Sequence, residues 1–210
     1  MKRIPSKCPL PRRFKRPSRC RPIAISSQRR LVAAGRKETT YPLTKLPRRG
    51  TYSLIISVLD EVRANVGRLG EKVFPRGYYA YTGSALGKGG TSLANRLSRH
   101  LRAQKRKRWH IDYLLAQKNV ELEAAVVVCS RERLECKFNK LIKTRMEATT
   151  PILGFGASDC KACCESHLLR FPHMTEGEVV VERMVSLASE LSKASSIRAF
   201  RVQRLMGAGD

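Results

Sequence analysis

The stretch GTYSLIISV, residues 50–58, constrains the fold of this 210-residue chain more than any other part of it. The large side chains of Tyr52 and Leu54 alternate with the smaller polar side chains of Thr51 and Ser53. A period of two residues is typical of a half-buried β-strand, which has one apolar and one polar face. The chain is therefore expected to build a sheet around residues 50–58.

Two further strands are expected later in the chain. Residues 77–83, GYYAYTG, form an aromatic-rich run that ends at a glycine, and residues 123–129, EAAVVVC, are almost entirely apolar. The glycines and charges of residues 60–76 indicate turns, with a short edge strand at 72–74.

Helical periodicity is expected in four segments, residues 91–101, 109–115, 133–146 and 178–194. In the first, Thr91 or Ser92 can cap the helix, and Leu93, Leu97 and Leu101 fall four residues apart on one face. The order strand, strand, helix, strand, helix predicts a small α/β or α+β layer fold.

Charge divides the chain into parts. Residues 1–49 hold sixteen Lys or Arg, one acidic residue and seven of the ten prolines, so this segment is expected to be a basic arm that does not fold alone. One domain at 50–174 and a C-terminal helix and tail at 175–210 are expected to follow. The formal net charge of +25 favours a polyanionic partner, in particular nucleic acid. The alternative is a solvated basic surface without such a partner.

The expected location is the cytoplasm. No apolar run approaches the roughly 18 residues that cross a bilayer, and the basic N-terminus lacks the apolar core of a secretory signal. Seven cysteines are an odd number, which favours reduced thiols or a metal site over a disulfide framework.

Several residues of the domain together resemble the GIY-YIG nuclease superfamily. They are Gly50, Thr51 and Tyr52 in the first strand, Tyr81, Thr82 and Gly83 in the second, Leu93, Arg96 and His100 in the next helix, and Glu135 in a later helix. Phrases such as GTYSLII, RLSRHL, WHIDYL and GFGASDC are similar to a largely archaeal branch of unknown function, sometimes joined to an endonuclease-three-type DNA glycosylase. The resemblance covers residues 50–174 and implies a three-stranded, mainly antiparallel sheet flanked by helices.

The resemblance also implies a function, a metal-dependent endonuclease that hydrolyses phosphodiester bonds in DNA and acts in repair, with a repair glycosylase as a further partner. Tyr52 and Tyr81 would lie side by side, and Tyr81 would handle the proton of the attacking water. A phenol with a pKa of about 10 needs a nearby cation for that role. Arg96 would contact phosphate oxygens, and His100, one helical turn later, would assist at the scissile phosphate. Glu135 would hold one Mg²⁺ or Mn²⁺ ion.

The sequence departs from the superfamily in two places. The 28 residues between Tyr52 and Tyr81 imply an inserted loop or hairpin, and no asparagine follows Pro151. Each residue also has a structural explanation: the tyrosines suit cross-strand packing, and a carboxylate such as Glu135 on a helix surface is commonly solvated. The alternative function is a non-catalytic nucleic-acid-binding module with a degenerate nuclease fold and a structural zinc.

The segment CKACCESH, residues 160–167, has the ligand spacing of a zinc site. The candidate ligands are Cys160, Cys163, Cys164 and His167. Cys160, one of the paired cysteines and His167 supply three ligands, and the fourth can come from Cys136, His110 or His173. Ordinary buried thiols are the alternative.

A basic run surrounds the end of the first helix. Sequence-independent phosphate contacts are expected from Arg99, Arg102, Lys105, Arg106, Lys107 and Arg108, together with Ser84 after the second tyrosine motif. The structural alternative is that cations complement the helix dipole at a C-terminus. Trp109 can stack on a base or fill the core.

Overall fold

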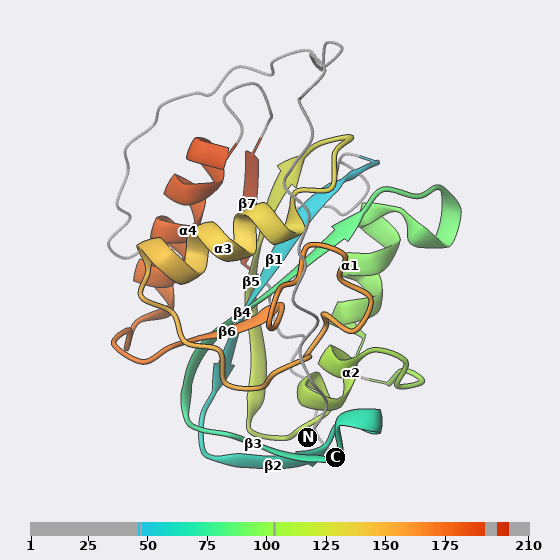
Figure 1. The fold of residues 1–210 in the computed structure, drawn as a ribbon. Coiled ribbons are helices and arrows are strands. Elements are labelled where there is room, and N and C mark those ends of the chain that lie inside the picture. Colours follow the sequence, from blue (N-terminus) through green and yellow to red (C-terminus); the bar gives the residue numbers. More distant parts are fainter. Residues whose placement is uncertain (1–45, 47, 103, 192–196, 202–210) are drawn as a thin grey trace, which may run out of the picture.

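The computed structural model describes residues 46, 48–102, 104–191 and 197–201 (Figure 1). Its centre is a five-stranded sheet in the order β6-β4-β1-β5-β7, in which every neighbouring pair is antiparallel. The strands are β1 (Gly50–Val58), β4 (Gly77–Ala85), β5 (Val120–Cys129), β6 (Leu168–Phe171) and β7 (Ile197–Arg201). The mixed α and β class, with an antiparallel sheet flanked by helices, is the expected one.

The sheet is larger than the three strands expected from the sequence. β1, β4 and β5 are those three, and two short strands extend the sheet at its edges. β6 pairs with residues 78–81 of β4, and β7 pairs with residues 124–128 of β5. Both come from the C-terminal part of the chain, so the segment predicted as a helix and tail contributes a strand to the same sheet.

β1 is buried on both faces, not on one face as its alternation predicted. Two of its buried polar side chains, those of Thr51 and Ser53, are accommodated because they bond to polar side chains of β4. The Thr51 hydroxyl lies 3.0 Å from that of Ser84, and the Ser53 hydroxyl lies 3.2 Å from that of Thr82. Buried hydroxyls that find partners in this way carry little desolvation penalty.

Helices cover the two faces of the sheet (Figure 1). They are α1 (Leu93–Leu101), α2 (His110–Leu115), α3 (Glu135–Arg145) and α4 (Gly177–Leu191). The face that carries Tyr52 and Leu54 packs against α1 and α2, and the face that carries Ile55 and Val126 packs against α3 and α4. The sheet is therefore the middle layer between two hydrophobic cores.

The long connection between the two tyrosine motifs is a hairpin, as its length predicted. β2 (Val62–Asn65) and β3 (Glu71–Phe74) pair as a separate two-stranded sheet, with the 3-10 helix η2 (Gly67–Leu69) at the turn. Phe74 is fully buried and belongs to the core below α1 and α2. The insertion therefore extends that core and leaves β1 and β4 free to pair directly.

Most of the predicted basic arm lies outside the described residues, which begin at 46. Within the described part of the chain, none of the helices combines the length and the apolar character needed to cross a membrane.

Candidate functional site

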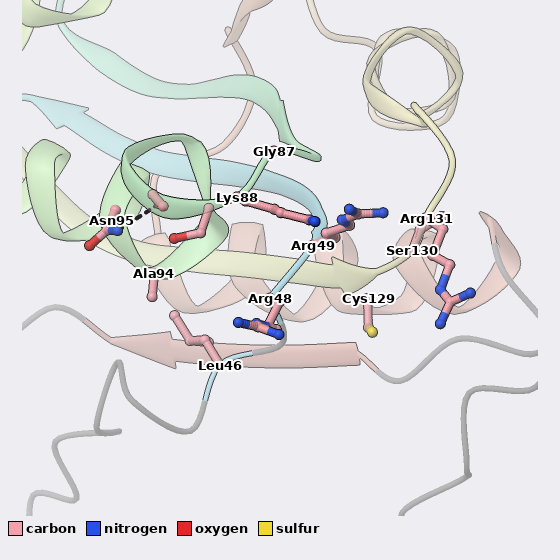
Figure 2. Close-up of a pocket in the computed structure, with 12 residues that line it drawn as sticks. Leu46, Arg48, Arg49, Gly87, Lys88, Ala94, Asn95, Cys129, Ser130 and Arg131 are labelled. Atoms are coloured by element: carbon pink, nitrogen blue, oxygen red, sulfur yellow. Dashed lines mark hydrogen bonds between the residues drawn. The ribbon is translucent and has the colours of Figure 1, made fainter.

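Two cavities lie near the end of the sheet where β4 and β5 finish and β1 begins. One, of about 700 Å³, is called the arginine pocket and is lined by residues that include Arg48, Arg49, Lys88 and Arg131 (Figure 2). The other, of about 850 Å³, is called the tyrosine cleft. Its lining residues include Tyr52, Tyr81, Ser84, Arg96, Arg108, Glu135, Asp159 and His167.

The two tyrosines predicted from the motifs meet in the tyrosine cleft. In the register of β1 and β4, Tyr52 lies opposite Gly83 and Tyr81 lies opposite Leu54, so both rings stand diagonally on one face of the sheet. A Cβ atom at Gly83 would come within 2.8 Å of the Tyr52 hydroxyl. Glycine is therefore required at this position because the Tyr52 ring occupies the space of a side chain.

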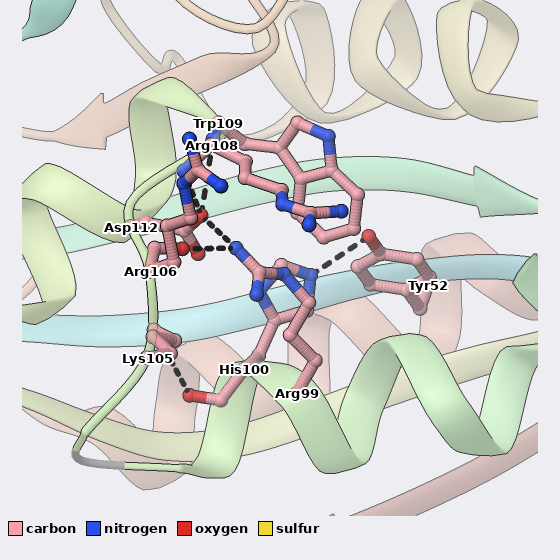
Figure 3. Close-up of polar contacts among 8 residues, drawn as sticks. All are labelled: Tyr52, Arg99, His100, Lys105, Arg106, Arg108, Trp109 and Asp112. Carbon is pink, nitrogen blue, oxygen red and sulfur yellow. Dashed lines mark hydrogen bonds and ion pairs between the residues drawn. The ribbon is translucent and has the colours of Figure 1, made fainter. Parts of the chain in front are cut away.

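Tyr52 is bonded to His100 beneath the cleft (Figure 3). The Tyr52 hydroxyl lies 2.9 Å from Nε2 of His100, and both side chains are buried. Burial raises the pKa of Tyr52 to about 12, although Arg96 acts in the opposite direction. Burial, together with Lys105 nearby, lowers the pKa of His100 to about 3. The pair is thus a neutral phenol held by a neutral imidazole, and His100 itself does not line the cleft.

Tyr81 lies between aromatic and glycine neighbours. Its ring is edge-on to Phe155 at a centroid distance of 6.1 Å, and a Cβ atom at Gly156 would come within 2.7 Å of it. Burial raises the pKa of Tyr81 well above its ordinary value, with the Tyr52 phenol adding to the shift and Arg96 opposing it. At neutral pH the side chain is a phenol, so a role as base needs a further cation in the cleft.

Arg96 and Glu135 come from opposite faces of the sheet to the same cleft. Arg96 projects from α1, with its guanidinium 5.2 Å from the Trp109 ring centroid. Glu135 is the first residue of α3 and is 6% exposed, with one carboxylate oxygen accepting a hydrogen bond from Arg133 at 3.2 Å. Among the described residues, the buried Nε of Arg96 and the buried Oε2 of Glu135 find no hydrogen-bond partner. Both atoms belong to residues that line the cleft, so a ligand there can satisfy them.

Asp159 is a further carboxylate in the cleft that the sequence analysis did not single out. Burial is the main reason why the pKa values of Tyr81 and Glu135 are raised. The Asp159 carboxylate lies close enough to raise both pKa values further. The segment GFGASD indicated a functional site only through its similarity to the family, because one Asp in a glycine-rich turn is otherwise typical of an ordinary loop.

The predicted basic run divides into structural and exposed cations. Arg99 forms an ion pair with the buried Asp112 and stacks 4.7 Å from the Trp109 ring centroid (Figure 3). Lys105 donates to the backbone carbonyl of His100 at 2.8 Å. Arg108, by contrast, lines the tyrosine cleft. Trp109 is half-buried, packs against His100 and two guanidinium groups, and also lines the tyrosine cleft.

The other residues expected to contact phosphate differ in their exposure and in whether they line the cleft. Arg102 and Arg106 are exposed, and Lys107 lies over the Tyr113 ring at 5.6 Å. Ser84 lines the cleft while bonded to Thr51.

A cluster of three cysteines and one histidine adjoins the cleft. It is called the Cys3His cluster and consists of Cys136, Cys160, Cys164 and His167, whose ligand atoms all lie within 4.8 Å of one another. The Cys136 sulfur is 3.4 Å from the Cys160 sulfur and 3.8 Å from Nε2 of His167. A tetrahedral zinc with Zn–S bonds of about 2.3 Å separates its ligand atoms by about 3.8 Å. The cluster can therefore hold a metal ion.

The ligand set is one of those that the sequence left open, with Cys164 in place of Cys163 and Cys136 as the fourth residue. Cys136 belongs to the cluster and Cys163 does not. Cys163 adopts a left-handed backbone with φ of 55° and is exposed, so the chain turns there and Cys164 enters the cluster. His110, another candidate ligand, accepts a hydrogen bond at Nδ1 from the Gly156 amide at 3.0 Å and stays outside it.

Backbone contacts fix the cluster against the sheet. The His167 amide donates to Phe155 at 2.8 Å, and its carbonyl accepts from Thr82 at 3.0 Å. Burial raises the pKa of the Cys136 thiol, and its hydrogen bonds with Cys160 and Cys164 add to the shift. Because Cys136 directly follows Glu135, the cluster ties the start of α3 to the wall of the cleft.

The sequence model of a protein family described as "Domain of unknown function DUF123" matches residues 51–190. The chain belongs to this family. Comparisons with curated proteins and with solved structures gave no match. The DUF123 region runs from β1 into α4. It therefore includes every residue of the tyrosine cleft and of the Cys3His cluster.

Proposed function

We propose that the protein is a GIY-YIG-type endonuclease that hydrolyses phosphodiester bonds in nucleic acid, with DNA as the expected substrate. The observation that carries this proposal is a pair of buried polar atoms, Nε of Arg96 and Oε2 of Glu135, in one cleft with Tyr52 and Tyr81. Neither atom has a hydrogen-bond partner in the part of the chain that the structure describes. A positive donor and a carboxylate beside two phenols suit a bound phosphate and the water that attacks it.

Each residue has a distinct role in this proposal. Arg96 binds phosphate oxygens and neutralises the charge that develops on them. Tyr81 accepts the proton of the attacking water, or orients that water through its hydroxyl. Tyr52 orients the same group from the next strand, and His100 acts as a positioning residue because its Nε2 holds the Tyr52 hydroxyl.

A single Mg²⁺ or Mn²⁺ ion fits the donor set of the cleft. Glu135 offers a buried carboxylate oxygen that no described residue hydrogen-bonds, and Asp159 lines the same cavity. Hard cations of this kind bind through one or two carboxylates and retain several waters. When bound, the ion would lower the pKa of the nearby phenol and of a coordinated water, which the raised pKa of Tyr81 requires.

The metal of the Cys3His cluster is proposed to be zinc with a structural role. Three thiolates and one imidazole form a complete tetrahedral set, whereas a catalytic zinc keeps one position open for water. In this proposal the zinc stabilises the loop that carries Gly156 and Asp159, and the hydrolytic ion is a different one at Glu135.

The second candidate function is a non-catalytic nucleic-acid-binding module of the same fold. The observation that favours it is the burial of both tyrosines, since Tyr52 and Tyr81 are 1% and 9% exposed and their raised pKa values oppose base catalysis. A module of this kind would bind nucleic acid and hold zinc without cutting, and would assist a repair enzyme.

Cleavage assays decide between the two functions. Supercoiled, single-stranded and branched DNA, and RNA, are incubated with the full chain in Mg²⁺ or Mn²⁺. Metal-dependent nicking is expected, with losses on the order of 100-fold or more in Tyr81→Phe and Glu135→Gln. The matched controls are Tyr78→Phe on the same strand and Glu132→Gln at an exposed position three residues before Glu135. No cleavage of any substrate, or full activity in Glu135→Gln, selects the binding module.

A further inference from the structure

The arginine pocket is positively charged without a counter-charge in its lining. Four cationic side chains line it, those of Arg48, Arg49, Lys88 and Arg131, and none of its lining residues is acidic. Among the described residues, Arg48, Arg49 and Lys88 form no ion pair. Like charges around one cavity repel one another unless an anion lies between them. The composition of the pocket therefore favours an anionic ligand.

The geometry of the pocket suits a phosphate group. Figure 2 shows the side chain of Lys88 extending in the direction of Arg49. The hydroxyl-bearing Ser92 and the residues Ala94 and Asn95 at the start of α1 also line the cavity. Arginine offers a planar fork of donors and lysine a compact charge, which are the two common ways of binding phosphate oxygens. The cations carry this inference, and the start of α1 adds donors to them.

The arginine pocket adjoins the tyrosine cleft through three shared segments. At the end of β4, Ser84 lines the cleft and Lys88 lines the pocket. On α1, Asn95 lines the pocket and its neighbour Arg96 lines the cleft. The connection from β5 to α3 likewise places residues 130–131 in the pocket and residues 133 and 135 in the cleft. The two cavities are therefore consecutive along one edge of the protein.

We propose that the arginine pocket binds a backbone phosphate of the same nucleic acid whose scissile phosphate enters the tyrosine cleft. This inference rests on the proposed function for its ligand and extends the contact surface beyond the reacting group. Holding a flanking phosphate fixes the register of the strand without reading its sequence. Free phosphate offers the same chemistry, so the test includes it as a separate arm.

The test compares two double variants of the full chain. Arg48→Ala with Lys88→Ala removes two exposed cations of the pocket, and Arg63→Ala with Lys118→Ala removes two exposed cations near the opposite end of the sheet. Binding of a short fluorescent DNA duplex and of a single strand is measured by anisotropy over a range of salt, without divalent metal. The pocket variant is expected to bind on the order of tenfold more weakly and to reduce the slope of log affinity against log salt by about one. The control variant is expected to change both only slightly.

The outcomes separate this inference from the nuclease proposal. Because binding is measured without metal, absence of cleavage leaves the result unaffected. Equal weakening in the two variants overturns the inference, since net charge alone then explains it. The free-phosphate arm measures thermal unfolding in the presence of inorganic phosphate. The inference is also overturned if phosphate stabilises the intact chain but not the pocket variant, while the two bind DNA equally well.

Discussion

Gly83 is a position at which one added methyl group would disturb the tyrosine cleft directly. A Cβ atom there would lie 2.8 Å from the hydroxyl oxygen and 2.9 Å from Cζ of Tyr52. Ordinary carbon contacts lie at about 3.5–4.0 Å, so in Gly83→Ala the ring must move by about 0.6 Å or more. Tyr52 is 1% exposed, and its surroundings therefore have to move as well.

The magnitude follows from the two interactions that this movement disturbs. Overpacking of a close-packed core costs about 1–3 kcal/mol. Weakening the 2.9 Å bond between Tyr52 and His100 leaves buried polar atoms without good partners, at about 1–3 kcal/mol. The free energy of unfolding is therefore expected to fall by about 2–6 kcal/mol in Gly83→Ala.

Urea denaturation measures this loss, and the single tryptophan makes the assay local. Trp109 packs 5.6 Å from the His100 ring centroid, so its fluorescence reports on the region that the substitution disturbs. Gly90→Ala is the matched control, because no atom lies within 4 Å of a Cβ built there and its backbone is not left-handed. It is expected to stay within about 1 kcal/mol of the parent chain. Equal midpoints and slopes for the two variants would refute the steric reasoning.

Three further outcomes are expected. Cys136→Ser should lose stoichiometric zinc and melt at a lower temperature, whereas Cys163→Ser should keep its zinc and its melting temperature. Metal analysis and calorimetry measure the two properties, and equal zinc contents in the two variants would remove Cys136 from the metal site. His100 has a pKa lowered to about 3 by burial, so the unfolded chain binds the extra proton below about pH 6.5. The contribution of this group to the free energy of unfolding is complete above that pH and falls toward about pH 3, with a loss of about 2 kcal/mol at pH 5. Urea titrations at several pH values should show this loss in the parent chain and not in His100→Gln. Removing residues 1–45, which hold fourteen Lys or Arg and one acidic residue, should flatten the salt dependence of DNA binding, and an unchanged slope would exclude the arm from the interface.

Long periodic elements were predictable from the sequence, and short edge strands were not. Residues 50–58, 77–85 and 120–129 carried enough apolar side chains to identify the three central strands. β6 has only four residues, and in LLRF a strand cannot be distinguished from one turn of helix by periodicity. The sequence IRAFR of β7 lacks a period of two, because its two arginines are three residues apart, so it resembles the basic loops of this chain.

The residues of the candidate site were predictable from the sequence, whereas the side chains that they contact were less predictable. Tyr52, Tyr81 and Glu135 were identified from motif order, and all three line one cleft. The sequence left Cys163 and Cys164 equivalent because the choice between them depends on a left-handed turn at Cys163. It also left His100 free to face a phosphate, whereas its burial and the bond to the Tyr52 hydroxyl follow from packing between α1 and the sheet.

The strand order β6-β4-β1-β5-β7 has a consequence for how the chain folds during synthesis. β1, the central strand, emerges from the ribosome before the strands that pair with it, and the two edge strands emerge last. Both of its neighbours, β4 and β5, are available once residue 129 has left the exit tunnel, so a three-stranded intermediate can form while translation continues. The thiols of residues 160 and 164 appear only afterwards. Metal capture is therefore expected to follow the pairing of the three central strands.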